Sequence, residues 1–397
     1  MVIQLRKNNI TDLLNLQGVS VNKKDFRKDS IKLWIELKQI VSICPCCGHK
    51  TSRVHDYYTR SFNHIKVDET AAHIYYKQRR YVCTNCGKRF AETNPFIQKF
   101  YRHSNDVVNR VFNNLSDIKS LKQIGKDNNM SSQNVSRLMN KFMPIFHNIT
   151  HLPEAIGIDE FRGNAGGNKF QVAITDLKTH KVVDVISARS EEALYNFFKN
   201  ISNPKDVMIV AMDLSLFFKN IIVDVFPNAK IVADTFHFTR LMHWALDNVR
   251  KEVQHNLPKE MRLYFKHSRS VLHKRIDELK TDQRQQLYRM LDYDEDLRWA
   301  YSITQKLFDV IDEKNPDKKV LLFKDFLTYS SNCDLPDFNK HLQTYFNWHK
   351  YIINSFYTNY SNGITEGLNT KIKTLKRVSF GFRNFQNFRL RILMACS

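Results

Sequence analysis

The sequence has no long apolar run. No stretch of about 18 apolar residues occurs, so a transmembrane helix is not expected. Residues 1–14 also lack a long apolar core behind their basic residues, so we expect no secretory signal peptide. Both absences predict a cytoplasmic protein that does not contact a membrane.

Glycine is missing from half of the chain. The 397 residues include 11 glycines, and none lies between Gly167 and Gly363. From Phe238 to about Asn359 strand patterns mostly disappear, and long amphipathic segments dominate, interrupted by prolines at positions 258, 316 and 336. We therefore predict an all-helical insertion over residues 241–355. Aromatic side chains on helices usually pack inward, so we expect a core position for its three tryptophans, Trp244, Trp299 and Trp348.

Acidic residues are fewer than basic ones, which gives a formal net charge of +21, and the excess of positive charge is unevenly distributed along the chain. Residues 1–150 carry 25 Lys and Arg against 11 Asp and Glu, and the residues after Glu366 carry 7 against none. The centre is balanced, with 29 of each sign. A basic front and a basic tail around a neutral centre favour a polyanion, most simply nucleic acid, held at both ends of a catalytic body. Charge kept for solubility would not explain the neutral centre.

The seven cysteines include two CxxC pairs that are each followed by glycine, at residues 44–48 and 83–87. Such a pair forms a tight turn that aims two thiolates at one ion. In a cytosolic protein this pattern favours metal over disulfides. We predict a structural Zn²⁺ ion bound by Cys44, Cys47, Cys83 and Cys86. Cys46 would be a spare thiol, and His49 and His55 surface residues. Four unrelated buried cysteines are the alternative.

Strand patterns surround the cysteine pairs, at residues 31–37 and in two hairpin-like segments, 72–76 and 79–82. Basic and aromatic residues also alternate around the second pair. This mixture suits phosphate contacts combined with base or sugar stacking. The candidate DNA contacts here are Arg79, Arg80, Lys88 and Arg89. Exposed charge on a small domain is the alternative for each of them.

Residues 104–142 have the period of helices. We predict helices over 106–115, 118–127 and 132–142, the last beginning at Ser131 or Ser132 as its cap. The last two helices have the pattern of a helix-turn-helix, whose second helix would present Gln133, Asn134 and Arg137 to a DNA groove. A generic helical pair matches the same pattern.

From residue 155 short apolar runs alternate with helical segments. We predict strands at 156–159, 170–176, 181–188, 207–212 and 230–233, with helices at 191–201 and 216–226. This order matches the mixed sheet of the ribonuclease-H-like fold. In that sheet the first and fourth strands are neighbours, so Asp159 would lie beside Asp213 at the carboxyl ends of the strands.

Acids at the ends of neighbouring strands are candidates for metal binding. Phosphodiester chemistry uses two divalent ions about 4 Å apart, and Mg²⁺ prefers carboxylate oxygens. Asp159, Asp213 and Glu366, which begins an all-basic helix, suit that task. Asp234 and His237 form a second polar group. For this group a buried His–Asp pair is as good an interpretation as a role in metal or phosphate positioning.

Taken together, these motifs resemble the ISL-three family of bacterial insertion-sequence transposases, of the DDE class. The resemblance rests on the cysteine pairs, the helix-turn-helix, the three strand-end motifs, and SNGITEGLNTKIKTLKR at 361–377 with its continuation FGFRNFQNFRLRIL at 380–393. It implies an α/β protein of several domains. A ribonuclease-H-like core with an all-helical insertion would follow a zinc-binding β module and a helix-turn-helix.

The resemblance also implies a site. Asp159, Asp213 and Glu366 would bind catalytic Mg²⁺ or Mn²⁺, with Asp234 and His237 as accessories. Asp234 is the alternative second acid, and Asp213 is preferred because the fourth strand neighbours the first. Near the cut, phosphates would be held by Lys371, Lys373, Lys376 and Arg377.

The implied reaction is metal-dependent cleavage at transposon ends, followed by strand transfer to target DNA. Its partners would be double-stranded DNA, as terminal inverted repeats and target, and a second copy of the chain, in the nucleoid of a bacterial cell. The expected domains are residues 1–100, 101–150, 151–240 with 356–397, and 241–355. A DNA-binding repressor with an inactive or domesticated catalytic body is one alternative, and a nuclease that cuts without joining is another.

Overall fold

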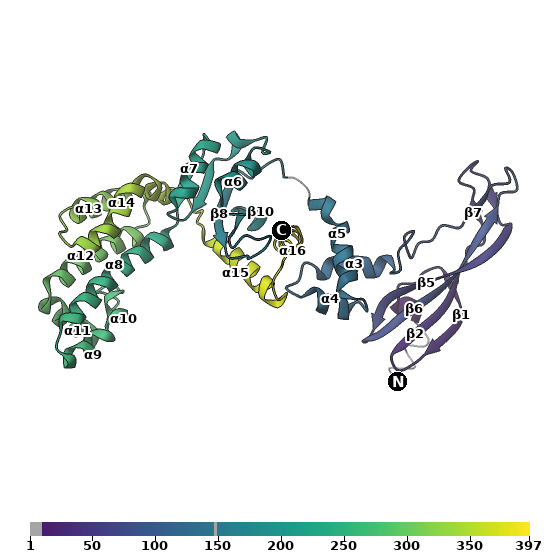
Figure 1. Cartoon of the computed structure of the whole chain (residues 1–397), viewed down its shortest axis with the longest axis horizontal. Coiled ribbons are helices and arrows are strands. Elements are labelled where there is room, and N and C mark those ends of the chain that lie inside the picture. Colours follow the sequence, from purple (N-terminus) through teal and green to yellow (C-terminus); the bar gives the residue numbers. More distant parts are fainter. Residues whose placement is uncertain (1–9, 147–148) are drawn as a thin grey trace. The chain divides into compact units, whose positions relative to one another are not determined.

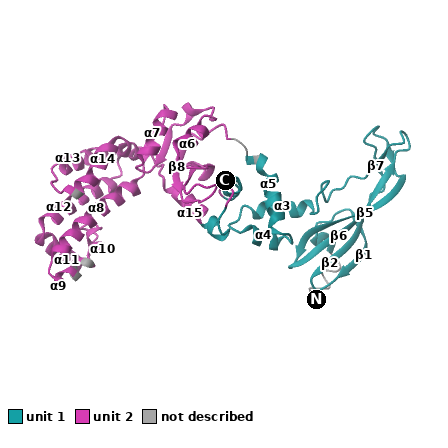
Figure 2. Ribbon diagram, in the orientation of Figure 1, with its two compact units in different colours: residues 1–147, 374–382, 386–395 teal, residues 148–373, 383–385, 396–397 magenta. Residues whose placement is uncertain are grey.

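A computed structural model describes residues 10–146 and 149–397. The chain divides into two compact units, each built from segments that are distant in sequence (Figure 2). The first comprises residues 1–147, 374–382 and 386–395, and the second comprises residues 148–373, 383–385 and 396–397. Residues 1–9, on which part of the signal-peptide prediction rests, lie outside the described residues. Within the described ranges, none of the helices has both the length and the apolar character needed to span a bilayer.

The first unit opens with the short helix α2 (Ile10–Leu13) and a five-stranded sheet (Figure 1). Its strands are β1 (Val19–Phe26), β2 (Ser30–Leu37), β5 (Val54–Val67), β6 (Thr70–Val82) and β7 (Arg89–Ala91). The order is β1-β2-β6-β5, with β7 also paired to β6. The predicted strand at 31–37 is confirmed. The predicted segments 72–76 and 79–82 are wrong as separate strands, because both belong to β6, whose alternate side chains from Ala72 to Tyr76 are buried.

Three helices follow in the first unit: α3 (Asn105–Asn114), α4 (Leu121–Asp127) and α5 (Ser132–Lys141), after which a 3-10 turn runs over Met143–Phe146. A serine side chain caps each helix by accepting from a backbone N–H group, and Ser131 is the cap of α5 as predicted. The spacing of Leu121, Ile124, Val135 and Leu138 predicts core positions; Ile124, Val135 and Leu138 are buried, whereas Leu121 is half-buried.

The C-terminal helix α16 (Phe385–Cys396) completes this helical core, which the sequence did not predict. Leu390 and Met394 are buried among the residues of α3, α4 and α5. Arg391 is fully buried and donates hydrogen bonds to the carbonyl groups of Leu115, Asp117 and Lys119. These bonds satisfy carbonyls in the turn between α3 and α4, so α16 belongs structurally to the helix-turn-helix.

The second unit contains the other five-stranded sheet, in the order β10-β9-β8-β11-β12. The strands are β8 (Ala155–Phe161), β9 (Gln171–Asp176), β10 (Lys181–Ile186), β11 (Ile209–Met212) and β12 (Lys230–Ala233). They are connected by helices α6 (Glu191–Phe198) and α7 (Leu216–Val225) and the 3-10 turn Pro204–Asp206. The fourth strand, β11, pairs in parallel with the first, β8, as predicted.

A run of helices follows the sheet (Figure 1). Its hydrophobic core is continuous with that of the sheet. The predicted breaks are confirmed, since Pro258 separates α8 from α9 while Pro316 and Pro336 begin α13 and α14. The helices are α8 (Thr235–Asn256), α9 (Lys259–Lys266), α10 (Arg269–Leu272), α11 (Thr281–Tyr293), α12 (Glu295–Asp312), α13 (Pro316–Ser330) and α14 (Pro336–Phe356).

The three tryptophans of this helical region differ from one another. Trp348 is buried as predicted, and Trp299 is half-buried and packs against Tyr329. The core prediction is wrong for Trp244, which is 47% exposed on the surface of α8.

Helix α15 (Gly363–Val378) begins against the sheet of the second unit. Ala155, Ala211 and Val232, from three neighbouring strands, form a small buried cluster that Tyr360 and Ile364 cover. The small side chains on this face allow the first turn of α15 to lie close to the strands.

Candidate active site and metal centre

Three acids meet where the parallel strands end. The registers of the β8–β11 and β11–β12 pairs, continued past the last paired residues, set Asp213 between Asp159 and Asp234. Asp159 and Asp234 are 8% and 3% exposed. The sequence-based prediction that Asp213 neighbours Asp159 is therefore confirmed.

Glu366 reaches this edge because α15 approaches β8 at a glycine. The hydroxyl of Thr365 lies 2.8 Å from the hydroxyl of Thr175 on β9. A Cβ atom at Gly157 would lie 2.1 Å from the Thr365 hydroxyl, so no larger residue fits between the strand and the helix. Glu366 lies on the first turn of α15, as predicted.

Asn369, one turn further along α15, fixes the orientation of Asp159. Its amide donates a 2.8 Å hydrogen bond to Oδ2 of Asp159, while the backbone N–H of Glu160 donates to Oδ1 at 2.8 Å. The sequence placed Asn369 on this helix but did not identify the contact. Its position three residues after Glu366, on the same helical face, was the available signal.

His237 lies among three carboxylates. Its Nδ1 is 3.6 Å from Oδ2 of Asp234, and its Nε2 is 3.9 Å from Oδ2 of Asp213 and 3.5 Å from Oε1 of Glu366. Asp234 also caps α8 by accepting from the backbone N–H of Phe236. The simple buried His–Asp pair considered from the sequence is therefore incomplete, because His237 also joins the strand edge to α15.

The crowding of acids shifts their ionisation. Burial, reinforced by the charge of Asp213, raises the pKa of Asp159 to about 7. Burial also raises the pKa of Asp213; His237 opposes this rise, and Asp234 and Glu366 add to it. The carboxylate of Asp234 is the main cause that raises the pKa of His237. This environment disfavours several ionised carboxylates unless positive charge is supplied.

The donor set fits a divalent cation. Among the described residues, Oδ1 of Asp213, Oδ2 of Asp234 and Oδ1 of Asn369 are buried without a hydrogen-bond partner. Unpaired buried oxygens are costly, and hard cations take such oxygens as ligands. The acids do not form a group whose ligand atoms all lie within 4.8 Å; within the described ranges the cysteines alone do so. A wider spread suits a pair of ions about 4 Å apart better than one.

A cleft of about 330 Å³ opens beside these acids. Asp213 and His237 line it on one side, and its remaining walls come from the start of α7, from α8 and α14, and from Glu160 and Arg189. The side chains of Arg240 and Trp244 on α8 also line the cleft. Arg189 and Arg240 were not predicted as site residues, and a core position was wrongly predicted for Trp244. The four-residue spacing of Phe236, Arg240 and Trp244, which sets them on one helical face, was the available signal.

The four predicted zinc ligands converge in the first unit. Sγ of Cys44 lies 3.6 Å from Sγ of Cys86, and Sγ of Cys47 lies 3.5 Å from those of Cys83 and Cys86. Four thiolates 2.3 Å from one tetrahedral Zn²⁺ are about 3.8 Å apart, so the cluster fits a structural zinc ion. Cys46 is exposed and outside the group, as predicted.

The two cysteine pairs have the same backbone turn. Gly48 N donates to Cys44 O and Gly87 N donates to Cys83 O, each at 3.0 Å. Both glycines have positive φ, 72° and 70°, a conformation that side chains disfavour. The first turn joins the short strands β3 (Ser42–Ile43) and β4 (Lys50–Thr51), and the second joins β6 to β7. This repeat explains why each pair ends in glycine.

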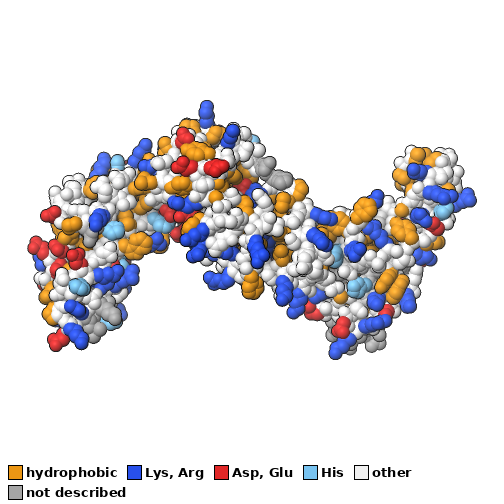
Figure 3. Space-filling view, viewed as in Figure 1, with side chains coloured by type: hydrophobic (Ala, Val, Ile, Leu, Met, Phe, Trp, Pro, Cys, Tyr) orange, Lys and Arg blue, Asp and Glu red, His pale blue; other side chains and the backbone are white. Residues whose placement is uncertain are grey.

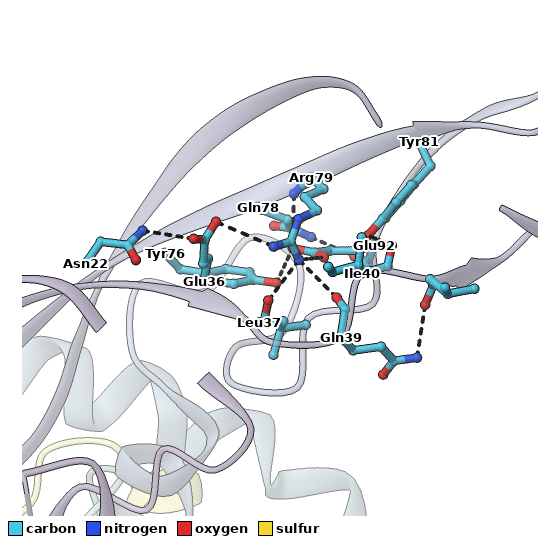
Figure 4. A network of polar contacts seen from close by, with 11 residues as sticks. Asn22, Glu36, Leu37, Gln39, Ile40, Tyr76, Gln78, Arg79, Tyr81 and Glu92 are labelled. Carbon is cyan, nitrogen blue, oxygen red and sulfur yellow. Dashed lines mark hydrogen bonds and ion pairs between the residues drawn. The ribbon is translucent and has the colours of Figure 1, made fainter. Parts of the chain in front are cut away.

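The structure corrects one predicted DNA contact, Arg79. Its guanidinium is buried, lies 3.3 Å from Glu92 and 3.5 Å from Glu36, and donates to the carbonyls of Leu37 and Gln39 (Figure 4). Arg79 therefore ties the sheet together and cannot reach a phosphate. A basic residue in a strand pattern does not reveal from sequence which face it occupies.

The other predicted DNA contacts are at least partly accessible. Arg80 is paired with Asp56 but remains 52% exposed, and most of the others are exposed: Lys88, Arg89, Gln133, Arg137, Lys371, Lys373 and Arg377. Asn134 and Lys376 are half-buried. Figure 3 shows Lys and Arg side chains over much of the visible face of the first unit, with few acids among them.

Two family models and one relative matched over nearly its full length indicate the same family. Residues 156–392, more than half of the chain, match a model of the DDE class and ISL-three group described as transposase. Residues 41–86 match one described as the zinc-finger of transposase IS204/IS1001/IS1096/IS1165. The chain is 21% identical over 403 residues to the transposase for insertion sequence element IS1001 of Bordetella parapertussis, covering 96% of this chain and 95% of that protein. A shorter match, 36% identical over 99 residues, is to a Lactococcus lactis subsp. lactis protein named ATP-dependent protease, and covers 25% of this chain and 30% of that protein.

Proposed function

The chain belongs to the ISL-three family of transposases, and from this premise we propose that it cuts DNA at the ends of an insertion sequence and joins them to target DNA. The observation that supports the proposal is the position of Asp213 beside Asp159 and Glu366, together with oxygens of Asp213, Asp234 and Asn369 that are buried without a hydrogen-bond partner among the described residues. A binding protein has no need of such a costly arrangement.

Asp159, Asp213 and Glu366 would hold two Mg²⁺ or Mn²⁺ ions. Bound ions would activate the attacking oxygen and stabilise the leaving oxygen of the phosphodiester. We assign the second acid to Asp213 rather than Asp234, because one oxygen of Asp234 already caps α8. Asn369 holds Asp159 by donating to Oδ2, which leaves its carboxylate fixed toward Asp213.

Asp234 and His237 are positioning residues in this proposal. Asp234 orients the imidazole, whose Nε2 faces both Asp213 and Glu366. A proton on Nε2 offsets the repulsion between these carboxylates when no cation is bound. His237 would thus keep the site assembled.

The first unit would bind the terminal inverted repeats. Structural zinc fixes the β module that carries Arg80, Lys88 and Arg89, and α5 would present Gln133, Asn134 and Arg137 to a groove. The basic face of α15 would hold phosphates near the cut through Lys371, Lys373, Lys376 and Arg377. We propose that a homodimer holds the two ends together in the bacterial nucleoid.

The domain organisation we propose is the one expected from the sequence. Residues 1–100 form the zinc-binding module and residues 101–150 the helix-turn-helix. Residues 151–240 and 356–397 would form a ribonuclease-H-like core, supported by the sheet order β10-β9-β8-β11-β12, except that α16 packs with the helix-turn-helix. Residues 241–355 would form the helical insertion.

Labelled duplexes carrying the element ends test the function. With Mg²⁺, we expect cleavage at the element boundary and then joined products with target DNA. Binding without cleavage would support a repressor or domesticated protein instead. Cleavage without joining would support a nuclease.

A further inference from the structure

A row of aromatic and basic side chains on α8 lies beside the carboxylates, and two of its members, Arg240 and Trp244, line the cleft. Phe236, Arg240 and Trp244 follow each other at four-residue spacing on α8, and the two rings are 53% and 47% exposed. The guanidinium of Arg240 lies between them, 5.4 Å from the centre of the Phe236 ring and 4.6 Å from that of Trp244. Phe236 immediately precedes His237 in the sequence, so this row of side chains on α8 begins beside the acidic site.

Arg240 is held in place without being neutralised. Among the described residues no carboxylate lies within ion-pair distance of it, and the two rings restrict its conformations. Guanidinium groups held on aromatic faces bind phosphate in a fixed geometry. The guanidinium of Arg240, packed on two rings and paired with no carboxylate of the described residues, is therefore available to bind an anion.

Arg189 also lines the cleft. It stacks 4.6 Å from the ring centre of Phe217 and binds Glu160 at 2.8 Å. Helix α7 begins at the cleft, with its cap Ser215 lining it. Glu160 offsets the charge of Arg189, so it is the guanidinium of Arg240 and the helix N-terminus that favour negative charge at this position.

Exposed tryptophan next to phosphate-binding groups is a platform for a nucleobase. Arg240 lies over the Trp244 ring, and no other described ring stacks on it, so the rest of its exposed surface is accessible. Stacking on an aromatic ring stabilises an unpaired base and requires no particular sequence. An ordinary surface cation–π pair would not need a cleft that opens onto Asp213.

We propose that this cleft is a subsite for one nucleotide of the strand being cut, which adjoins the scissile phosphate. Arg240 binds its phosphate, Trp244 stacks on its base, and Arg189 lines the same cleft. The proposal rests on the function proposed above and identifies the part of the substrate that this site holds.

Photo-crosslinking tests the subsite without requiring catalysis. A duplex carrying one element end and its flank would contain 5-iodouracil at single positions across the boundary, with Ca²⁺ replacing Mg²⁺ to prevent cleavage. We expect a crosslink to Trp244 from a position within about two nucleotides of the cleavage point. Trp244→Ala should reduce its yield roughly tenfold or more, and Trp244→Phe should retain most of it. Tyr288→Ala, which removes a 52% exposed ring from α11, should leave it unchanged.

Salt dependence tests the phosphate contact. Arg240→Ala should weaken end binding several-fold and reduce the slope of log affinity against log salt by about 1. A methylphosphonate at the contacted phosphate should remove the difference between Arg240→Ala and the unsubstituted protein. Lys251→Ala, which removes a 61% exposed cation from the same helix, is the matched control. It should bind unmodified DNA with the affinity and salt slope of the unsubstituted protein.

The outcomes separate the two proposals. Crosslinking to Trp244 by a protein that does not cut in Mg²⁺ would support the subsite and overturn the proposed reaction. Normal cleavage by Trp244→Ala and Arg240→Ala, or crosslinks that map away from α8, would overturn the subsite and leave the reaction standing. Absence of any crosslink on bound DNA would also overturn the subsite.

Discussion

Gly157 and Thr365 are in contact although about 200 residues separate them, and a Cβ atom at position 157 would lie 2.1 Å from the Thr365 hydroxyl. This contact sets how closely α15 approaches β8, and therefore where Glu366 and Asn369 lie relative to Asp159. The assembly of the candidate active site therefore depends on the absence of a side chain at Gly157.

We predict that Gly157→Ala abolishes DNA cleavage and leaves end binding intact. The added methyl group must displace α15, and overpacking of this kind costs about 1–3 kcal/mol of stability. Cleavage assays, end-binding assays and thermal unfolding would measure the three effects. Gly367→Ala is the matched control, because position 367 is helical with open space around it, so unchanged or slightly higher stability and normal cleavage are expected. Normal cleavage by Gly157→Ala would contradict this account of the site.

Isosteric amides test the three proposed metal ligands. We expect Asp159→Asn, Asp213→Asn and Glu366→Gln each to reduce cleavage at least about a thousandfold, since the bound ions supply several kcal/mol of transition-state stabilisation. End binding should remain within about twofold. Asp234→Asn should retain measurable cleavage, because its main contacts are the α8 cap and His237. Titration of Mn²⁺ binding by calorimetry gives an independent readout. Stronger loss in Asp234→Asn than in Asp213→Asn would reverse the assignment of the second acid.

The sequence predicted the sheet of the second unit well because its signals are local. Short apolar runs ended by Asp213 and Asp234 mark buried parallel strands, and their order fixes which strands are neighbours. Side-chain environment was harder to predict. Trp244 has the helical spacing of a core residue, yet the insertion turns this face outward. Similarly, the packing of α16 on α3 through Arg391 depends on contacts across more than 270 residues, which no local pattern encodes.

Loss of the zinc ion should weaken the binding of DNA ends, because the ligands lie in the β module and not in the candidate active site. We predict that Cys44→Ser and Cys83→Ser each abolish stoichiometric zinc and weaken specific end binding at least tenfold, because an incomplete ligand set cannot fold the β module around the ion. Elemental analysis and end-binding assays measure the two effects. Cys46→Ser is the control and should keep both zinc and affinity, since this thiol lies outside the cluster. Full zinc content in Cys44→Ser would contradict the ligand assignment.

Arg79 and Arg80, adjacent in sequence, should respond in opposite ways. Arg79→Ala leaves Glu92 buried without its partner, which costs about 3–5 kcal/mol for a buried pair, so we expect a marked loss of thermal stability. Arg80→Ala should change stability by less than about 1 kcal/mol, because its pair with Asp56 is exposed. The Arg80 variant should instead reduce the salt dependence of DNA binding. Equal stability of the two variants would contradict the structural role assigned to Arg79.

Acid should destabilise the helical insertion through a pair of stacked histidines. The rings of His243 and His273 lie 4.5 Å apart with planes at 8°, and among the described residues neither Nε2 has a hydrogen-bond partner. Burial, with repulsion from His243 and Arg269, lowers the pKa of His273 to about 4. Burial also lowers the pKa of His243. In the unfolded chain a histidine titrates near 6.5.

Because these pKa values are lowered by folding, the neutral rings stabilise the protein fully above about pH 6.5. As the pH falls from there through about 4, the unfolded chain takes up protons that the folded chain does not, so stability is lost across that window. Allowing for partial exposure, we expect a loss of about 1 kcal/mol by pH 5, or roughly 2–4 °C in Tm. His273→Phe retains a ring for the stack but cannot titrate, so its Tm should fall less between pH 7 and pH 5. An identical acid dependence in both proteins would show that this pair does not set the response.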